Sequence, residues 1–483
     1  MDKPFIKLFH TPNSGYFLDV NMNQIIQISK TSYQYLYDLL SDRNDGCALM
    51  PNELIALKRE GFLDTESVVK EVRHPYSDFI DVFLERKVSK ITLQVTQECN
   101  LRCKYCIYDE DRNRRQRSHS NRSMSWSTAK KAMDFLWERS VDSTRVNVGF
   151  YGGEPLIEFS LIKKTIQYSE YMFSGKELTF SLTTNGTLLN DEIILYLQNH
   201  NVSLMISLDG PKDINDINRV FSDGSGTYDA IIEKIERIKI IAPEYAAKLQ
   251  ISMVIDQQND FDCINTVFLD ESEINGLTLL SSNIDRDYDD IGNETPNKFT
   301  WKSEYHMFLA FLSHYGRYPK DRVSPLLKRT LSEAVSDYSR FENSLGLYDT
   351  DAPSGPCVPG QFRPFITVSG RIFPCERVSE MSNAMCIGSL DNGFFMENVT
   401  RILNIGHITE QECKNCWCFR YCNMCAKKAD YNGNDLSAER KLAHCATTKA
   451  NAYNKIRQRI LLKEIPIYYQ KQASTRKIGS FVL

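Results

Sequence analysis

Three closely spaced cysteines constrain this chain more than any other feature of its sequence. Cys99, Cys103 and Cys106 follow an apolar run, Ile91–Val95, with the spacing C-x3-C-x2-C. Thiolates at this spacing can hold three irons of a 4Fe–4S cluster and leave the fourth iron open for a small ligand. A structural zinc knuckle is the alternative, but such zinc normally takes four protein ligands, and no fourth Cys or His adjoins the loop. The spacing therefore favours a cluster with one open iron.

The cysteine loop resembles the signature of radical S-adenosylmethionine (SAM) enzymes. The resemblance implies that Cys99, Cys103 and Cys106 bind the catalytic 4Fe–4S cluster, whose open iron holds the methionine part of SAM. Tyr105, directly before the third cysteine, matches the family's aromatic position beside the adenine. Reductive cleavage of SAM would then give a 5′-deoxyadenosyl radical that takes a hydrogen atom from an unactivated carbon.

A glycine-rich motif follows the second predicted strand. Gly152, Gly153 and Glu154 stand before a proline, and together they match the family motif that binds the amino group of SAM. Two glycines allow the backbone to approach a ligand closely, and Glu154 adds a carboxylate at the end of the strand. A plain turn is the alternative reading of a glycine pair.

Polar residues at the ends of later strands complete the expected SAM site. By resemblance, Ser207 contacts SAM, and Asn185 and Asp209 lie close to it, although Asp209 equally suits a turn cap. Arg219 matches an arginine that pairs with the SAM carboxylate, a bidentate role that suits a guanidinium. A surface role is the alternative for Arg219.

A second set of cysteines lies in the C-terminal third, where nine of the fourteen cysteines fall between about residues 351 and 450. Clustered C-x2-C spacings indicate metal binding rather than disulfides. The order of these cysteines resembles the SPASM extension, which carries two auxiliary 4Fe–4S clusters. Two residues stand before Cys425 where the usual run has three. One zinc in a four-thiolate ribbon is the alternative.

The resemblance implies an interleaved assignment of these cysteines. One auxiliary cluster would be held by Cys413, Cys416, Cys422 and Cys445, and the other by Cys357, Cys375 and Cys425. The second set has three ligands, which predicts an open iron able to bind a substrate thiolate. Cys386 and Cys418 compete as its fourth ligand, and Glu376 is a weak candidate for a base. We assign no role to Cys47, Cys263, His74 or His444.

The expected fold class is α/β. Apolar strands alternate with helices from about residue 88, which predicts a parallel sheet, with functional residues at the carboxyl ends of the strands. Helices are expected at Ser127–Arg139 and Tyr228–Ile240. The six predicted strands are Ile91–Val95, Arg145–Phe150, Leu178–Leu182, Val202–Ser207, Leu249–Ile255 and Leu277–Leu280. The resemblance implies that this sheet is a partial (β/α)6 barrel.

Five segments are predicted along the chain. Residues 1–85, with three strands and then two helices, resemble the winged-helix recognition element that binds the leader of ribosomally made precursor peptides; a plain scaffold is the alternative. Residues 86–285 form the barrel, 286–350 a helical bridge, 351–450 the SPASM domain and 451–483 a tail.

Together the segments resemble radical SAM maturases of ribosomally made peptides, and the open auxiliary site favours sactipeptide- or ranthipeptide-type thioether formation. Expected partners are a cysteine-containing precursor peptide with a leader and a reductant such as flavodoxin or ferredoxin. Formylglycine-type oxidation, carbon–carbon crosslinking and a non-catalytic peptide-binding role are the alternatives. The net charge of −4 and the absence of a long apolar run argue against nucleic-acid and membrane partners. A cytoplasmic location is expected.

Overall fold

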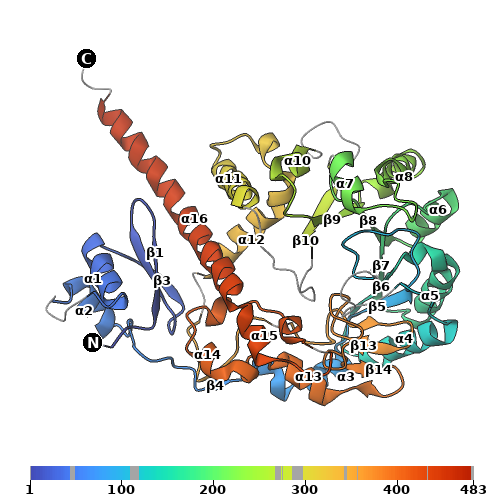
Figure 1. Cartoon of the computed structure of the whole chain (residues 1–483), viewed down its shortest axis with the longest axis horizontal. Helices are drawn as coiled ribbons and strands as arrows, with labels where there is room; N and C mark the ends of the chain where they lie inside the picture. Colours follow the sequence, from blue (N-terminus) through green and yellow to red (C-terminus); the bar gives the residue numbers. More distant parts are fainter. Residues whose placement is uncertain are drawn as a thin grey trace.

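A computed structural model describes residues 2–43, 49–108, 119–266, 274, 276–284, 297–341, 345–355, 357–431 and 433–479. Cys47 lies outside the described residues. Figure 1 shows three parts: the N-terminal sheet, the barrel and the cysteine-rich block. The C-terminal helix runs past the N-terminal sheet. None of the helices in the described part is long and apolar enough to cross a membrane.

The largest sheet contains the predicted barrel strands. Six parallel strands follow one another in space in chain order: β5 (Lys90–Thr96), β6 (Arg145–Gly152), β7 (Glu177–Thr184), β8 (Val202–Ser207), β9 (Gln250–Ile255) and β10 (Thr278–Asn283). Each lies within a few residues of its predicted position, so the predicted strands and the partial (β/α)6 architecture are confirmed. Their fully buried side chains, such as Val148 and Ile206, form one face of the core.

Helices connect these strands and cover the outside of the sheet (Figure 1). They are α4 (Trp126–Arg139), α5 (Phe159–Met172), α6 (Asp191–Asn199), α7 (Lys212–Asn218), α8 (Tyr228–Ile241), α9 (Pro243–Ala246) and α10 (Phe261–Thr266). Ser125 caps α4 and Asn190 caps α6 by accepting a hydrogen bond from a backbone N–H of the first turn. Right-handed strand–helix–strand connections place every strand's carboxyl end at the same edge.

The N-terminal unit has its own small core. The antiparallel strands β1 (Ile6–His10), β2 (Gly15–Asp19) and β3 (Gln24–Ile28) pack against α1 (Lys30–Leu40) and α2 (Asn52–Arg59). Phe17, Leu36 and Leu54 are almost fully buried between these elements. The carboxylate of Glu53 on α2 accepts hydrogen bonds from Ser29 and Ser32, which joins the two helices. The predicted order of three strands before two helices is confirmed.

The cysteine-rich block extends the barrel sheet beyond β5. Strand β12 (Phe365–Ile366) pairs parallel with β5, and β13 (Arg371–Phe373), β14 (Gly388–Ser389) and β15 (Gly393–Phe394) continue it antiparallel. Three helices follow: α13 (Met396–Leu403), α14 (Glu410–Lys414) and α15 (Ala438–Ala443). Because the pairing is backbone to backbone, the block is held at a fixed register against the strand that leads into Cys99.

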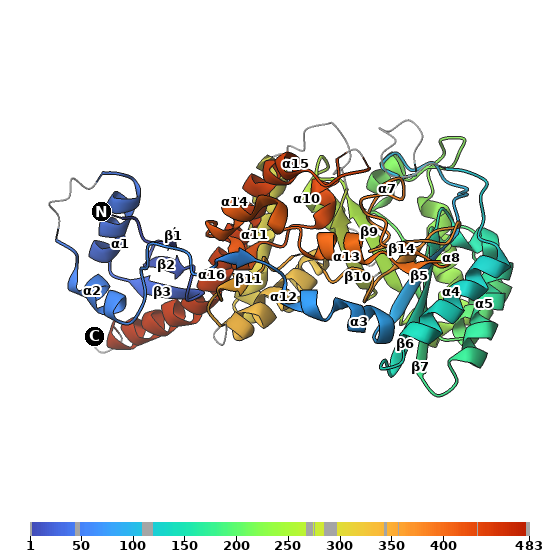
Figure 2. The same ribbon diagram turned by 90° about the horizontal axis from the view of Figure 1, so that it is seen from below.

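The C-terminal helix α16 (Cys445–Gly479) begins at an expected cluster ligand and crosses the predicted boundary at residue 450. Ile456 and Ile460 pack with Phe9 of β1, while Leu462 packs against the bridge helices α11 (Asn297–His314) and α12 (Pro325–Phe341). Figures 1 and 2 both place α16 beside the N-terminal sheet. Glu464 accepts hydrogen bonds of 2.8 Å from the hydroxyls of Thr11 and Tyr16. The helix therefore joins the N-terminal unit to the cysteine-rich block.

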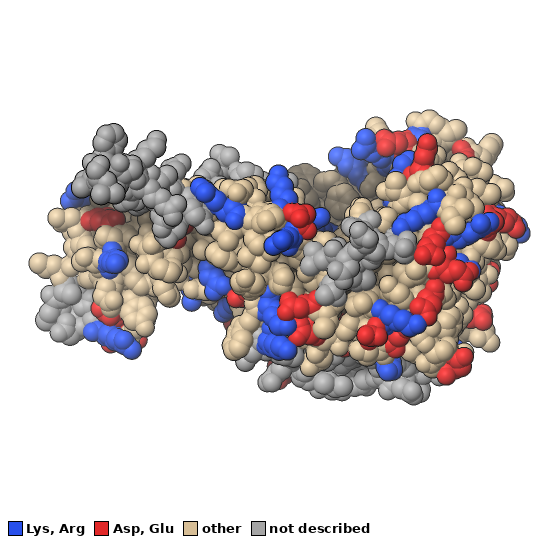
Figure 3. Space-filling view, turned by 90° about the horizontal axis from the view of Figure 1, so that it is seen from above, with Lys and Arg blue, Asp and Glu red and all other residues tan. Residues whose placement is uncertain are grey.

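Charge is mixed over the surface. Figure 3 shows acidic and basic side chains interspersed over the barrel face that it presents, without a broad field of one sign. Ion pairs between exposed side chains of the described residues include Arg86–Asp142 and Arg237–Asp191. The distribution agrees with the near balance of charge in the sequence.

His74 follows β4 (Glu71–Val72) and connects it to the cysteine-rich block. Its environment leads us to expect that the stability of the protein depends on pH. Its backbone N–H donates to Asn404 at 2.7 Å, and its Nδ1 accepts from the N–H of Tyr76. Burial lowers the pKa of His74, partly opposed by Asp351. The unfolded chain therefore binds the proton more readily, and this contribution to stability is complete above the unfolded pKa of about 6.5 and lost as pH falls below it.

We expect the urea midpoint of unfolding to fall as the pH is lowered from about 7.5 to about 5.5. The fall should be smaller in His74→Gln, which keeps an acceptor for Tyr76 but does not titrate in this range. An identical fall of the urea midpoint in both proteins would show that groups other than His74 cause the loss of stability at low pH.

Candidate active site

The cysteine loop leaves the carboxyl end of β5 and is fixed by backbone hydrogen bonds to the segment after α7. Arg102 N–H donates to Val220 at 2.8 Å, and Lys104 N–H donates to Asn218 at 2.9 Å. Cys106 has electrostatic contacts with both Cys99 and Cys103, so the three thiols converge. Burial raises the pKa of Cys99 and of Cys106 to about 12. The guanidinium of Arg219 opposes this rise only in part, and a bound iron would supply the positive charge that the three sulfurs need as thiolates.

A histidine lies closer to this loop than the sequence suggested. His119 Nε2 is 3.7 Å from Cys106 Sγ, and the expectation that no fourth Cys or His is near the loop was therefore wrong. The two residues are thirteen positions apart. The chain returns to the loop after residues that lie outside the described part, so spacing alone did not reveal the approach.

The glycine motif at the end of β6 packs closely against the backbone that leads into the cysteine loop. A Cβ at Gly152 would lie 2.2 Å from the carbonyl oxygen of Thr96, and one at Gly153 would lie 2.1 Å from that of Glu98. Gly152 also has a φ of 147°, which L side chains rarely adopt. The close approach expected for a ligand is made here by the backbone that leads into Cys99.

Glu154 is fully buried and its carboxylate holds the ends of β6 and β7 together. It accepts hydrogen bonds from Thr184 Oγ1 at 2.7 Å, Asn185 N–H at 2.8 Å and Leu156 N–H at 3.0 Å. Burial raises the pKa of Glu154, and these three donors oppose the rise. The side chain is thus a positioning element, and the backbone of the motif is left to meet an amino group.

Asn185 at the end of β7 also binds the protein rather than open space. Its Nδ2 donates to Asn100 Oδ1 at 2.8 Å, and Asn100 Nδ2 donates to Thr187 Oγ1 at 2.9 Å. Asn100 directly follows the first cysteine. These hydrogen bonds thereby fix the loop to the end of β7. Sequence reasoning gave Asn100 no role, and it expected the hydroxyls of the Thr183–Thr187 motif to suit a ligand, whereas Thr184 donates to Glu154.

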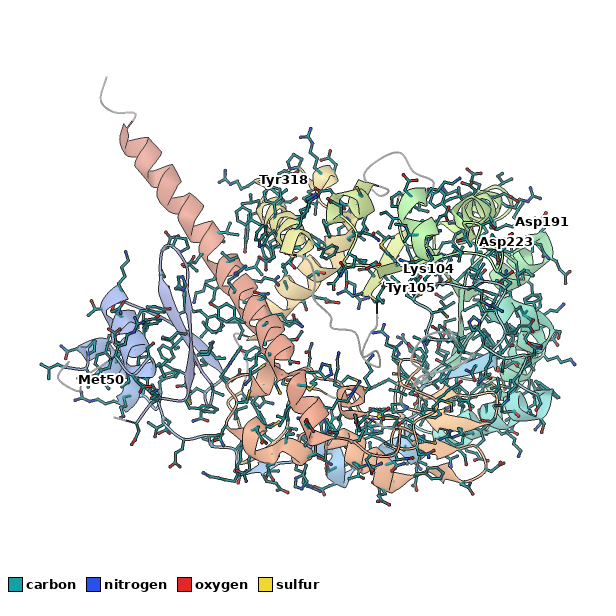
Figure 4. All side chains as sticks on the ribbon, in the orientation of Figure 1. Met50, Lys104, Tyr105, Asp191, Asp223 and Tyr318 are labelled. Carbon is teal, nitrogen blue, oxygen red and sulfur yellow. The ribbon has the colours of Figure 1, made fainter. Side chains whose placement is uncertain are left out.

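Tyr105, Asp209 and Arg219 form one buried network on the β8–β9 side of the site. Tyr105 donates its hydroxyl proton to Asp209, and Arg219 Nη1 donates to the tyrosine oxygen at 2.9 Å. Asp209 also accepts from Val254 N–H at 2.9 Å. Figure 4 labels Tyr105 on the inner side of the barrel, toward this part of the sheet. Burial raises the pKa of Asp209, while the guanidinium of Arg219 opposes the rise.

Two polar groups at this edge have no hydrogen-bond partner among the described residues. Arg219 is 6% exposed, and its Nε is buried without a hydrogen-bond partner. Ser207 at the end of β8 is half-buried, and no hydrogen bond from its hydroxyl is found among the described residues. A free guanidinium N–H and a free hydroxyl beside three converging thiols suit a carboxylate-bearing ligand of an iron–sulfur cluster. The residues present therefore fit a cluster with SAM.

The C-terminal cysteines form two separate groups. Cys425 has electrostatic contacts with Cys357 and with Cys375. A second group joins Cys416 to Cys413 and Cys445, and Cys422 to Cys413 and Cys416. The resemblance implies this same interleaved grouping, and ligation itself stays a prediction. Among the described residues, no three or more Cys, His, Asp and Glu side chains are placed to hold a single metal ion.

Neither of the competing ligands, Cys386 and Cys418, has a described electrostatic contact with Cys357 or Cys375. Cys418 has electrostatic contacts with Cys416, Cys422 and Cys445, which puts it beside the other group. Cys386 is buried and donates its S–H to the carbonyl of Gly388 at 3.4 Å. The electrostatic contacts described for Cys357 and Cys375 include Cys425 and neither of the competing cysteines.

Two carboxylates of this block have well-defined partners, and one of them joins the block to the barrel. Glu376, the weak candidate for a base, forms an ion pair with Arg363, so its carboxylate is already engaged. Glu380, which the sequence did not single out, is 8% exposed and accepts from Gln94 Nε2 at 2.8 Å and Gln97 Nε2 at 2.9 Å. Both glutamines lie on or just after β5, so Glu380 ties the block to the start of the cysteine loop.

Comparison with known proteins identifies the central domain. The description "Radical SAM superfamily" matches residues 93–269, which include the cysteine loop, the glycine motif and Arg219. Residues 93–269 form a radical SAM domain. A radical SAM domain implies a 4Fe–4S cluster and SAM, which the three thiols and Arg219 suit. The match ends before the C-terminal cysteines, so it does not test the two auxiliary clusters.

Two curated relatives match part of this chain. It is 36% identical over 134 residues to the uncharacterized protein MJ0907 of Methanocaldococcus jannaschii, covering 28% of this chain and 43% of the relative. It is 28% identical to the radical SAM cyclopropyl synthase TigE of Paramaledivibacter caminithermalis, over 43% of this chain and 45% of the relative. The chain thus spans less than half the length of these two relatives.

A longer match reaches the cysteine-type anaerobic sulfatase-maturating enzyme of Clostridium novyi, at 24% identity over 72% of this chain and 90% of the relative. Among solved structures, native anSMEcpe with bound AdoMet aligns with a TM-score of 0.56 and 18% identity, over 78% of this chain and all of that one. The same protein with AdoMet and Cp18Cys peptide aligns with a TM-score of 0.55 and 19% identity, over 78% and 100% of the two chains. The shared structure confirms the α/β radical SAM fold.

Proposed function

We propose that this radical SAM enzyme modifies a ribosomally made precursor peptide and joins one of its cysteines to a carbon as a thioether. The observation that carries the proposal is the group of three thiols formed by Cys357, Cys375 and Cys425. Cys418 lies with the other group, and Cys386 donates to a backbone carbonyl. Iron held by three thiolates keeps a soft position for a fourth sulfur, which a substrate cysteine would supply.

The chain's residues divide the task between two sites. Cys99, Cys103 and Cys106 hold one cluster, and Arg219 and Ser207 orient the amino-acid end of SAM. When bound, cluster and SAM supply a carbon radical that takes a hydrogen atom from the peptide. Glu380 sets the distance between this site and the cysteine-rich block by binding Gln94 and Gln97. Net, the peptide would lose a hydrogen atom from carbon to the SAM-derived radical, a proton from sulfur to solvent and one electron to an iron–sulfur cluster, while the new S–C bond replaces the C–H and S–H bonds.

The N-terminal unit supports a peptide substrate with a leader. Its sheet ends in β3, an edge strand whose partner on the other side is not another described strand. Such an edge accepts an extended peptide through main-chain hydrogen bonds. A neighbouring structure, anSMEcpe, binds a peptide beside AdoMet. We propose that residues 1–85 bind the leader and that flavodoxin or ferredoxin delivers the electron.

Formylglycine-type oxidation is the second candidate, because a match over 383 residues is to a cysteine-type sulfatase-maturating enzyme. That match covers 72% of this chain, and the N-terminal unit gives a maturase of this kind no evident advantage. Carbon–carbon bond formation is the third, favoured by the partial match to TigE.

The test uses reconstituted enzyme, SAM, dithionite and the cysteine-containing peptide encoded nearest to its gene. We expect a product lighter by two hydrogens whose cysteine no longer reacts with iodoacetamide. A product of that mass with a reactive thiol would indicate a carbon–carbon bond, and an aldehyde trapped by a hydrazine would indicate formylglycine. Either result would overturn the thioether proposal.

A matched pair of variants tests the three-thiol group. Cys375→Ala should lose thioether formation while still releasing 5′-deoxyadenosine, because the barrel site is intact. Cys386→Ala removes a nearby buried cysteine that lies outside the group and should keep thioether formation. Equal loss in both variants would count against an open site at Cys357, Cys375 and Cys425.

A further inference from the structure

Lys441 on α15 is a buried lysine whose partner is a sulfur. The residue is 4% exposed, and its ammonium donates to Thr409 Oγ1 and to Cys413 Sγ, the latter at 3.4 Å. Buried lysines are rare unless they are paired with a negative group. In the described part of the chain no carboxylate lies within ion-pair distance of Lys441. The polar partners described for this ammonium are therefore one hydroxyl and the sulfur of Cys413.

Thr409 adds a second donor to the same sulfur. Its Oγ1 lies 3.2 Å from Cys413 Sγ and accepts the hydrogen bond from Lys441. Because the lysine occupies the hydroxyl as an acceptor, the hydroxyl proton is free to point at the sulfur. Cys413 thus receives one hydrogen bond from a cation and one from a hydroxyl that the cation polarises. Lys441 also has an electrostatic contact with Cys422.

The two cysteine groups therefore differ in the charge around them. Cys416 has an electrostatic contact with Lys449, so two lysines face the group that contains Cys413. Around the other group, Cys375 has contacts with Glu376 as well as Arg363, and the two charges offset each other. The group at Cys413 is the more positive of the two.

We propose that Lys441 is a positioning residue that raises the reduction potential of the cluster held by Cys413, Cys416, Cys422 and Cys445. Reduction of such a cluster adds one electron and hence one negative charge. Hydrogen bonds to the ligating sulfurs and nearby positive charge stabilise the reduced form more than the oxidised form. This centre is then the more oxidising of the two auxiliary centres. The inference rests on the auxiliary clusters of the proposed function.

The test is a potentiometric titration with dithionite, followed by electron paramagnetic resonance. The full chain carries Cys99→Ala, Cys103→Ala and Cys106→Ala, so that the auxiliary centres alone contribute. In Lys441→Met we expect one wave to move to lower potential while the other stays. At a fixed potential the ratio of reduced to oxidised cluster should fall about tenfold, which is about 59 mV for one electron.

Three further variants separate the lysine's charge from a change in packing. Lys441→Arg keeps the charge and the donors and should stay near the parent potential. Thr409→Val removes the polarised hydroxyl at nearly constant volume and should give a smaller shift in the same direction. Lys455→Met removes an exposed lysine of α16 and should give no shift.

The outcomes distinguish this inference from the proposed function. If the parent chain shows no iron–sulfur wave that is lost in Cys416→Ala, the expected cluster is absent and the proposed function fails with it. If the wave is present and Lys441→Met and Thr409→Val both leave its potential unchanged, the inference about Lys441 is overturned and the proposed function stands. If Lys441→Met fails to assemble its cluster, a shift in Thr409→Val supports the inference, and no shift there overturns it.

Discussion

Replacing Cys103 by Ala is expected to abolish the release of 5′-deoxyadenosine from SAM, by roughly a thousandfold or more, because the radical chemistry belongs to the cofactor that this thiol helps to hold. Cys103 stands between Cys99 and Cys106 in the converging set, and burial raises its pKa. Without it, two thiols and the nearby His119 remain. The measurement is 5′-deoxyadenosine by liquid chromatography after anaerobic reduction with SAM and without peptide.

Iron content makes this result specific. Three 4Fe–4S clusters require about 12 irons per chain, and loss of the barrel cluster alone should leave about eight. Cys263→Ala is the matched control, because that thiol is exposed, lies on α10 and belongs to neither the cysteine loop nor the C-terminal cysteine groups. It should keep both its iron and its activity. Undiminished SAM cleavage in Cys103→Ala, or about four irons with one zinc in the parent chain, would contradict the assignment.

Hydrophobic pattern predicted the barrel well because apolar residues recur at every second position of its strands. In Ile91–Val95 and Val202–Ser207 the residues at every second position are apolar and buried, unlike the pattern of the amphipathic helices between them, and the structure has strands at both places. The cysteine groups were also predictable, because metal ligands must recur at short fixed spacings. What spacing could not supply was the position of His119 or the placement of Cys418 beside the other cysteines.

Residue roles were harder to predict than residue positions. Glu154 and Asn185 were expected near SAM, and both lie at the site, yet their side chains bind Thr184 and Asn100. A carboxylate or amide at a strand end has the same sequence signal whether it meets a ligand or a neighbouring loop. Lys441 gave no signal at all, since a lysine in a short helix is usually exposed. Its burial depends on α15 packing next to Cys413, a contact between residues 28 positions apart.

Arg219→Met is expected to weaken SAM binding by roughly a hundredfold, because truncating one partner of a buried charge pair costs about 3 kcal/mol. Arg219 donates to Tyr105, has electrostatic contacts with Asp209 and Cys103, and keeps its Nε free. Its orphan N–H suits the SAM carboxylate. Methionine fills a similar volume but offers no donor and leaves Asp209 without a cation. The measurement is equilibrium binding of SAM to the anaerobically reconstituted protein.

A truncated ligand separates binding from structure in this variant. Methylthioadenosine keeps the adenosine of SAM but lacks its amino and carboxylate groups. Arg219→Met should bind it as the parent does, whereas a collapse of the Tyr105–Asp209 network would weaken both ligands together. Arg219→Lys keeps the charge but not the planar fork, so it should recover only part of the SAM affinity. Tyr105→Phe tests the network alone: if Arg219 binds the carboxylate directly, this change should cost less SAM affinity than Arg219→Met, and an equal or larger cost would place the role of Arg219 in holding Tyr105.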